Sequence, residues 1–241
     1  MEGREPDPAQ LARKRRIQYL SLAAFAAVAV VIALIAVSQS GGDDDSDETA
    51  SSVQGASEVS ALLDGIPQDG SVLGDPAAEV AVIEFADPQC PVCRSFAIEV
   101  LPQLIADRVR PGDVSYEYRN WDIIGADSEV ASKAALAAGE QDRLFQFIQL
   151  FYANQGEENS GYVTDDFLER IAEGAGIPDV DRWKQDRGSA EWDPRLKEVN
   201  AEAESLGFVG TPSILVTGPR GQRPLEGFGL DEIEAAIQQV S

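Results

Sequence analysis

The strongest feature of the hydrophobicity pattern is a run of 21 residues without a charge, residues 17–37. About 20 apolar residues let an α-helix cross a bilayer, whereas the apolar core of a signal peptide has about 7 to 15. Basic residues precede the run and acidic residues follow it, which places the N-terminus in the cytoplasm. We therefore predict a cytoplasmic segment over 1–16 and one transmembrane helix over 17–37. A cleaved secretory leader is the alternative.

The next stretch, residues 38–57, is acidic and rich in Gly and Ser, with too few apolar positions to build a core. We predict a disordered acidic linker there. A flexible chain of this length spans roughly 20 to 25 Å, so it would hold the following domain close to a membrane. An acidic binding tail is the alternative interpretation.

Residues 58–241 alternate between short apolar runs and segments of helical period, which predicts one α/β domain. Strands are expected over 80–85, 113–121, 208–217 and 223–228, with helices over 58–65, after 93 and over 231–240. Between the second and third strands lie only helix-period segments, so we predict a helical block over about 127–206. Residues 66–78 are rich in Pro and Gly and predict a loop. Asp231 is expected near the N-cap of the last helix.

Charge and composition exclude several classes of function. The chain carries a net charge of −23, and because residues 1–16 carry +2, the remainder carries −25. Such an acidic body is repelled by phosphate backbones, which argues against nucleic-acid binding. The chain has no histidine, so neither a Cys-His nor a Ser-His catalytic arrangement is possible.

The candidate chemistry lies in the sequence Cys-Pro-Val-Cys, where Cys90 and Cys93 are the only cysteines. The box follows a predicted strand and begins a predicted helix, with Pro91 in its first turn. At a helix N-terminus the free backbone N–H groups and the dipole favour a thiolate, so the pKa of Cys90 should be depressed. We predict a redox dithiol in which Cys90 is the nucleophile and Cys93 resolves. This chemistry needs neither a metal nor an organic cofactor.

Two structural alternatives for the box are weaker. A disulfide that closes so short a loop would stabilise the fold little, because the effect grows with loop length. A zinc site would need four ligands, and this chain has no histidine and no third cysteine to add to the two of the box.

Two other residues are candidates for a role beside the box. Glu84 lies six positions before Cys90, inside the apolar strand, where a charged side chain is costly without a partner. It could exchange protons with the resolving thiol, or it could lie at an exposed strand edge, and the spacing does not separate the two. Pro212 lies near the start of a strand, where it could be an edge feature or a cis peptide bond; the residues alone favour the edge.

Two stretches, SVLGDPAAEVAVIEFADPQCPVCRSF over 71–96 and GTPSILV over 210–216, resemble the DsbA-like thiol-disulfide oxidoreductases of the thioredoxin superfamily. The resemblance covers about residues 65–241. It implies a thioredoxin-like fold with a helical insertion, Cys90 as nucleophile, Cys93 as resolving thiol and Glu84 as the acidic residue beside them. It also implies that Pro212 is a cis-proline facing the box.

The sequence departs from the family pattern at one position of the box. Well-studied oxidases of the family have histidine where this chain has Val92, which cannot hydrogen-bond a thiolate, so Cys90 should be less acidic than in those relatives. Thr211, the variable residue before the cis-proline, also occurs in relatives that act as isomerases or reductases. We assign substrate contacts to Pro91, Val92, Thr211 and Pro212.

These observations predict an extracytoplasmic enzyme, anchored in the cell membrane, that donates the Cys90–Cys93 disulfide to exported reduced proteins. Its location suits the chemistry, because protein disulfides persist outside the cytoplasm. A membrane redox partner should recycle the box. The alternatives are a reductase or isomerase on the same scaffold, and a redox-inert peptide-binding or chaperone module.

Overall fold

The structure is a computed structural model, and it describes residues 53–241. The predicted cytoplasmic segment, transmembrane helix and most of the linker lie outside these residues. Among residues 53–241, no helix is both long enough and apolar enough to cross a membrane. The first helix, α2 (Ala56–Leu63), begins two residues before the expected domain boundary at 58.

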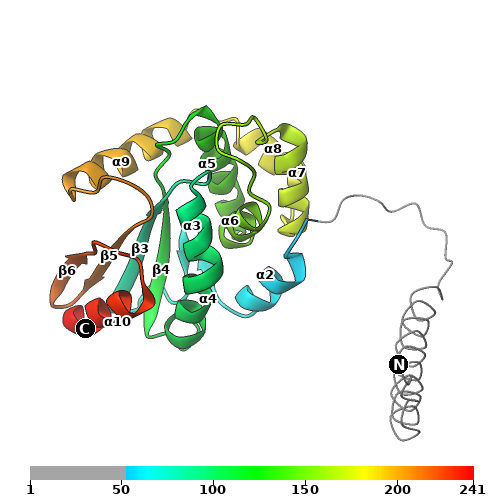
Figure 1. Cartoon of the computed structure of the whole chain (residues 1–241). Coiled ribbons are helices and arrows are strands. Elements are labelled where there is room, and N and C mark those ends of the chain that lie inside the picture. Colours follow the sequence, from blue (N-terminus) through cyan, green and yellow to red (C-terminus); the bar gives the residue numbers. More distant parts are fainter. Residues whose placement is uncertain (1–52) are drawn as a thin grey trace, which may run out of the picture. The chain divides into compact units, whose positions relative to one another are not determined.

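A six-stranded mixed sheet forms the centre of the described part (Figure 1). Its strand order is β1-β2-β4-β3-β5-β6, and only β3 and β4 pair in parallel. The strands are β1 (Gln68–Asp69), β2 (Val72–Leu73), β3 (Val80–Ala86), β4 (Val114–Asn120), β5 (Ser213–Gly218) and β6 (Gly221–Pro224).

Three details of the sheet differ from the expected strands. Residues 66–78 are not only loop, because β1 and β2 form a short hairpin there that extends the sheet beyond β4. Two-residue strands carry too little periodicity to be recognised in a sequence. The strand expected from 208 begins only at Ser213, and β6 lies at 221–224 rather than 223–228, because the turn before it is tighter than expected.

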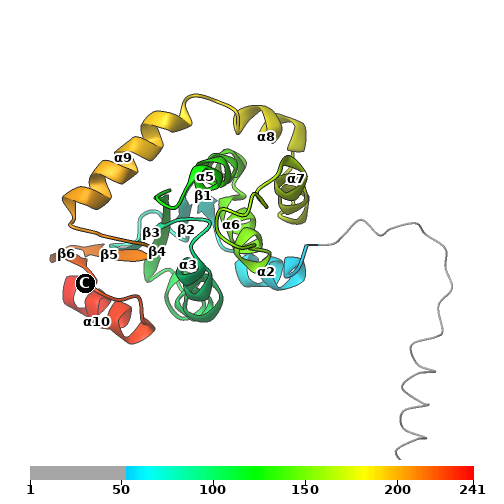
Figure 2. The ribbon, with the colours of Figure 1, turned by 45° about the horizontal axis from the view of Figure 1, so that its top comes forward.

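Alternation along β3 separates two apolar layers, because successive strand residues point to opposite faces. Val80 and Val82 face the larger core, which includes residues of α10 (Leu230–Val240). Ile83 and Phe85 face a smaller cluster with Ala203 of α9 (Trp192–Ser205). Figure 2 accordingly shows α9 on one side of the sheet and α10 on the other.

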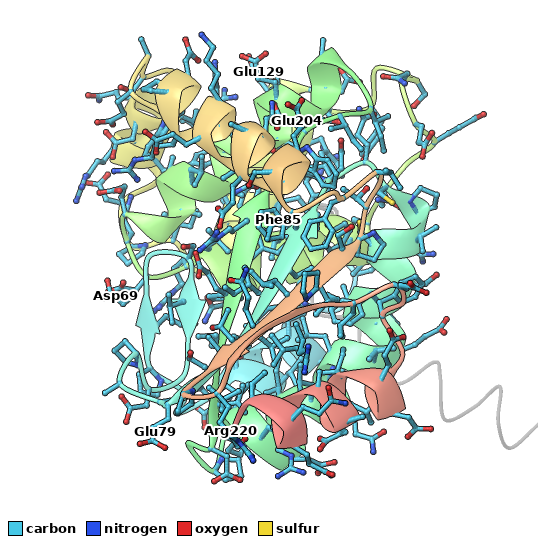
Figure 3. The ribbon with its side chains drawn as sticks, turned by 90° about the vertical axis from the view of Figure 1, so that its left-hand side faces the viewer. Asp69, Glu79, Phe85, Glu129, Glu204 and Arg220 are labelled. Atoms are coloured by element: carbon cyan, nitrogen blue, oxygen red, sulfur yellow. The ribbon has the colours of Figure 1, made fainter. Side chains whose placement is uncertain are left out.

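Phe85 is the centre of that smaller cluster (Figure 3). Its ring is fully buried and meets the rings of Trp121 and Phe208 edge-on, at centroid distances of 6.5 and 5.3 Å. Burying one such side chain contributes about 1.5–3 kcal/mol to stability. The cluster therefore fixes the strand that leads directly into the Cys-Pro-Val-Cys box.

The predicted helical block between β4 and β5 is present. It contains α5 (Ala126–Gly139), α6 (Leu144–Ala153), α7 (Asp165–Gly174), α8 (Val180–Asp186) and α9. Alanine side chains line the buried side of α5, which allows the neighbouring helices to approach closely. One hydrogen bond joins α8 to α5: Trp183 donates from Nε1 to the carbonyl of Ala134 at 2.8 Å. The expected α/β domain with a helical insertion is thus confirmed.

The helix after the box is less regular than its period predicted. It runs from α3 (Pro91–Ser95) through a π-helical segment (Phe96–Val100) into α4 (Leu101–Leu104) and a second π-helical segment (Ile105–Val109). Pro102 has no amide hydrogen to donate to the preceding turn. The helix accommodates it with a wider turn, in which the N–H of Leu101 bonds the carbonyl of Phe96. The last helix, α10, has Gly229 as its N-cap residue and no side-chain cap, and Asp231 lies in its first turn, near the N-cap as expected.

Candidate active site

Cys90 is the N-cap residue of α3, and Pro91 occupies the first helical position as expected. The turn before it is held by Asp87, a fully buried carboxylate. Asp87 Oδ1 accepts from the N–H of Gln89 at 2.8 Å, and Oδ2 accepts from the N–H groups of Ile123 and Ile124 at 2.8 and 2.9 Å. A single side chain therefore ties the box to the segment that follows β4.

The Cys90 sulfur lies where a negative charge is stabilised. Sγ accepts from the backbone N–H of Cys93 at 3.4 Å. The pKa of Cys90 falls from 9.0 to about 6, chiefly because the Cys93 thiol can donate to the thiolate. Burial opposes this fall in pKa, whereas hydrogen bonds from the Thr211 side chain and from the amides of Cys93 and Val92 add to it. The depressed pKa that the helix N-terminus predicted is therefore present, without a histidine in the box.

Cys93 has the opposite environment, one helical turn further along. Its side chain is completely buried, and burial raises the pKa of this thiol well above 9.0. The hydrogen bond to Cys90 and the nearby charge of Glu84 raise it further. Both cysteines are free thiols in the structure. The pair thus combines one sulfur that favours the thiolate with one that favours the protonated thiol.

Glu84 lies in the central strand β3 and is 1 % exposed, so the alternative of an exposed strand edge is wrong. Burial raises its pKa from 4.5 to about 8, a hydrogen bond from Tyr116 opposes the rise, and the charge of Cys90 adds to it. Oε2 accepts that hydrogen bond, whereas Oε1 is buried and has no partner within the described residues. A carboxyl group with this pKa can both take and give a proton near neutral pH.

Pro212 follows a cis peptide bond from Thr211. The cis form implied by the family resemblance is therefore present, and the edge-strand interpretation is wrong because β5 pairs with β3 and β6. The backbone carbonyl of Thr211 accepts from the Cys90 thiol at 3.4 Å. Thr211, two residues before β5, thus lies directly against the box, although it is 121 residues away from Cys90 in the sequence.

The surface next to Cys90 offers apolar contacts. Pro91 is exposed and Val92 is 42 % exposed. On the side of Pro212, Val209 is 98 % exposed, which makes it the most exposed large apolar side chain among residues 53–241.

Sequence reasoning missed the polar groups that α6 and the residues after it supply to this site. The hydroxyl of Tyr152 donates to the carbonyl of Asp87 at 3.1 Å and shares a 2.9 Å hydrogen bond with Tyr118. Gln155 donates from Nε2 to the carbonyls of Pro88 and Cys90 at 2.8 and 3.1 Å. The helical period of the α6 segment predicts that Tyr152 is buried in the core. The period does not indicate which of the buried positions lies next to the active site.

Comparison with known proteins places these features in a family. Residues 68–238 match a protein family described as thioredoxin. A probable disulfide bond formation protein D of Bacillus cereus is 32 % identical over 150 residues, which cover 61 % of this chain and 69 % of that protein.

Solved structures share the fold. Oxidised BdbD from Bacillus subtilis superposes with a TM-score of 0.63 at 23 % identity, over 70 % of this chain and 91 % of that one. DsbA from Chlamydia trachomatis gives 0.62 at 24 % identity, over 70 % and 90 %. The chain therefore belongs to the thioredoxin family, in which it is a DsbA-like thiol-disulfide oxidoreductase.

Proposed function

We propose that Cys90 is the exchanging sulfur and that the enzyme donates the Cys90–Cys93 disulfide to reduced client proteins. A client thiolate attacks Cys90 Sγ, the bond between the two cysteines breaks, and Cys93 leaves with the electron pair. A second client thiolate then attacks the client sulfur of the mixed disulfide and releases Cys90 as a thiolate. The client gains a disulfide, and the box gains two electrons.

The observation that carries this direction is the difference between the two sulfurs. The pKa of Cys90 falls to about 6, so the last step releases a stabilised thiolate. A thiol of low pKa leaves readily, and stabilising the reduced box makes its disulfide more oxidising. The isomerase and reductase alternatives lack an observation of this kind.

Glu84 supplies the proton that this cycle requires. When the disulfide opens, Cys93 becomes a buried thiolate, a form that burial disfavours. The Glu84 carboxyl group, with its pKa raised to about 8, donates a proton to Cys93 and recovers one when the box is oxidised again. We assign the client contacts to Pro91, Val92 and the Thr211–Pro212 segment.

The cellular setting forms part of the proposal. The uncharged residues 17–37 are long enough to span a bilayer, and the bias of basic residues before them favours a cytoplasmic N-terminus. The enzyme would then act on exported proteins outside the cytoplasm, tethered by residues 38–57, with residues 58–241 as the catalytic domain. A redox partner in the same membrane would reoxidise the box.

The redox equilibrium of the box tests the direction. The full-length protein is equilibrated with mixtures of reduced and oxidised glutathione, and its free thiols are counted by alkylation. A reduction potential toward about −120 mV supports the donor role, whereas one near or below about −270 mV makes the protein a reductase.

A second experiment separates an enzyme from a redox-inert binding module. Cys93→Ser should accumulate mixed disulfides between Cys90 and clients, because the resolving sulfur is missing. Cys90→Ser should abolish both these adducts and disulfide exchange. A module that only binds peptides would keep its binding in both variants and form no adducts.

A further inference from the structure

Tyr116 forms a hydrogen bond with Glu84 that the proton exchange proposed above does not use. Tyr116 lies on β4 and its hydroxyl donates to Glu84 Oε2. The other carboxyl oxygen, Oε1, is buried and has no partner within the described residues. One oxygen of the carboxyl group is therefore held while the other stays available for a proton.

The position of the tyrosine hydroxyl is fixed by pairing and packing. In the parallel β3–β4 pair, Tyr116 lies opposite Val82 and Tyr118 lies opposite Glu84, so both tyrosines share the face that Glu84 occupies. The Tyr116 ring is completely buried, and its centroid is 5.8 Å from that of Phe145. A buried ring packed against its neighbour keeps its hydroxyl at one place and so keeps the carboxyl group in one orientation.

We propose that Tyr116 is a positioning residue for proton exchange between Glu84 and Cys93. Its hydroxyl holds Oε2 and stabilises the carboxylate, which leaves Oε1 to exchange the proton. Tyr116 itself does not titrate in the cycle, because burial and the neighbouring Glu84 raise its pKa well above 10.

The step in which Tyr116 acts can be written with its atoms balanced. With Cys90 in a mixed disulfide, the proton of Cys93 Sγ passes to Glu84 Oε1 through one water molecule, because the two atoms make no direct hydrogen bond. The Cys93 thiolate attacks Cys90 Sγ, the bond between the two cysteines forms, and the bond from Cys90 to the partner sulfur breaks. The partner leaves as a thiolate with the electron pair, and Glu84 keeps the proton.

The other ionisable groups that influence Glu84 do not replace this contact. Cys90 and Cys93 lie on the active-site helix, and Tyr118 and Tyr152 are uncharged phenols whose pKa values burial raises well above 10. From β5, the residue opposite Glu84 is the apolar Ile214. No cation contributes to the pKa of Glu84 among residues 53–241. The Tyr116 hydroxyl is thus the group that favours the carboxylate form.

The test compares Tyr116→Phe with Tyr118→Phe. Both variants remove one buried hydroxyl from the same face of β4, but the Tyr118 hydroxyl bonds Tyr152 and not Glu84. The titration of Glu84 is followed by ¹³C NMR of carboxyl-labelled glutamate in the reduced full-length protein. The Glu84 signal is assigned as the one that disappears in Glu84→Gln.

A hydrogen bond to a charged group is worth enough to shift a pKa by about one to two units. We therefore expect the Glu84 midpoint to move upward by about one to two pH units in Tyr116→Phe and to stay in place in Tyr118→Phe. Equal midpoints in wild type and Tyr116→Phe would overturn the proposal, as would equal shifts in the two variants.

Kinetics give a second readout. Reduced protein is mixed with oxidised glutathione, and the release of the second glutathione thiol reports the attack by Cys93. At pH 7, Tyr116→Phe should slow this step by roughly 3- to 10-fold, within the range of general base catalysis. In a Glu84→Gln background the same substitution should have no further effect, and an equal slowing there would contradict the proposal.

The proposal rests on disulfide exchange through the box but not on its direction, and the NMR titration needs no exchange at all. Failure of the titration and failure of the proposed function are therefore distinguishable. If Tyr116→Phe does not fold, wild type labelled with 3-fluorotyrosine, a stronger hydrogen-bond donor, should show a downward shift of the Glu84 midpoint. An unchanged midpoint in the labelled protein would overturn the proposal.

Discussion

The side-chain amide of Gln155 donates a hydrogen bond of 3.1 Å to the backbone carbonyl of Cys90. The same nitrogen bonds the carbonyl of Pro88 at 2.8 Å. The residues after α6 therefore hold the backbone on which the nucleophile is mounted, at a separation of 65 residues in the sequence.

Gln155→Ala should loosen the box. Two carbonyls lose their donor, so we expect the free energy of unfolding to fall by about 1–2 kcal/mol, measured by urea denaturation. The thiolate of Cys90 should also react faster with iodoacetamide at pH 7, because its turn is less fixed.

Gln141→Ala is the matched control for that change. Gln141 also joins two backbone segments, through hydrogen bonds of 2.9 and 2.8 Å to the carbonyl and N–H of Asp179, at a place remote from the box. It should reduce stability but leave the alkylation rate of Cys90 unchanged. Equal alkylation rates in both variants would show that Gln155 has no special relation to the box.

The stability of the reduced protein should depend on the ionisation of Cys90. Folding lowers the pKa of this thiol from 9.0 to about 6. Its contribution is therefore absent below about pH 6, grows as pH rises toward 9, and is complete above the unfolded-state value. We expect the stability difference between reduced wild type and Cys90→Ser to increase between pH 6 and 9 in urea denaturation. A difference that stays flat over this range would contradict the depressed pKa.

The contribution of Glu84 to stability should fall as pH rises, whereas that of Cys90 grows. Folding raises the pKa of this carboxyl group from 4.5 to about 8, so its contribution is complete below pH 4.5 and is lost as pH rises to 8. The free energy of unfolding of Glu84→Gln, taken relative to that of wild type, should therefore increase by about 3–5 kcal/mol from pH 5 to pH 9. The measurement is the free energy of unfolding at both pH values, and a constant difference would mean that Glu84 titrates normally.

Val92→His should make the box a stronger oxidant. Val92 is 42 % exposed and its amide already contributes to lowering the pKa of Cys90. An imidazolium there would stabilise the thiolate further, so we expect the Cys90 pKa to fall by about one unit and the reduction potential to rise by about 30 mV. The two quantities are measured by alkylation against pH and by equilibration with glutathione.

Val130→His provides the control for this gain. Val130 lies on α5, a different helix from the one that Cys90 caps, and is 41 % exposed, so the same substitution is accommodated at similar exposure outside the box. It should change neither the pKa of Cys90 nor the potential. A rise in potential in both variants would indicate a general effect of added charge.

Local sequence was sufficient for the elements that lie next to the box. The apolar run that became β3, the Pro91 that opens α3 and the position of Cys90 at a helix start all follow from neighbouring residues. The helical block was also predictable, because its helices are long enough to show their period. The β1–β2 hairpin and the π-helical turns were missed, because each is shorter than one clear repeat.

By itself, the sequence determined that this protein carries a redox dithiol at a strand-to-helix junction within an α/β domain. Only the tertiary structure decided which groups surround that dithiol. The parallel pairing of β3 and β4 brings Tyr116 to Glu84, the cis peptide bond lies against Cys90, and the helical block supplies Tyr152 and Gln155. These contacts join residues 32 to 121 positions apart. Such pairings depend on how the sheet and the helices pack, which the periodicity of any single segment does not encode.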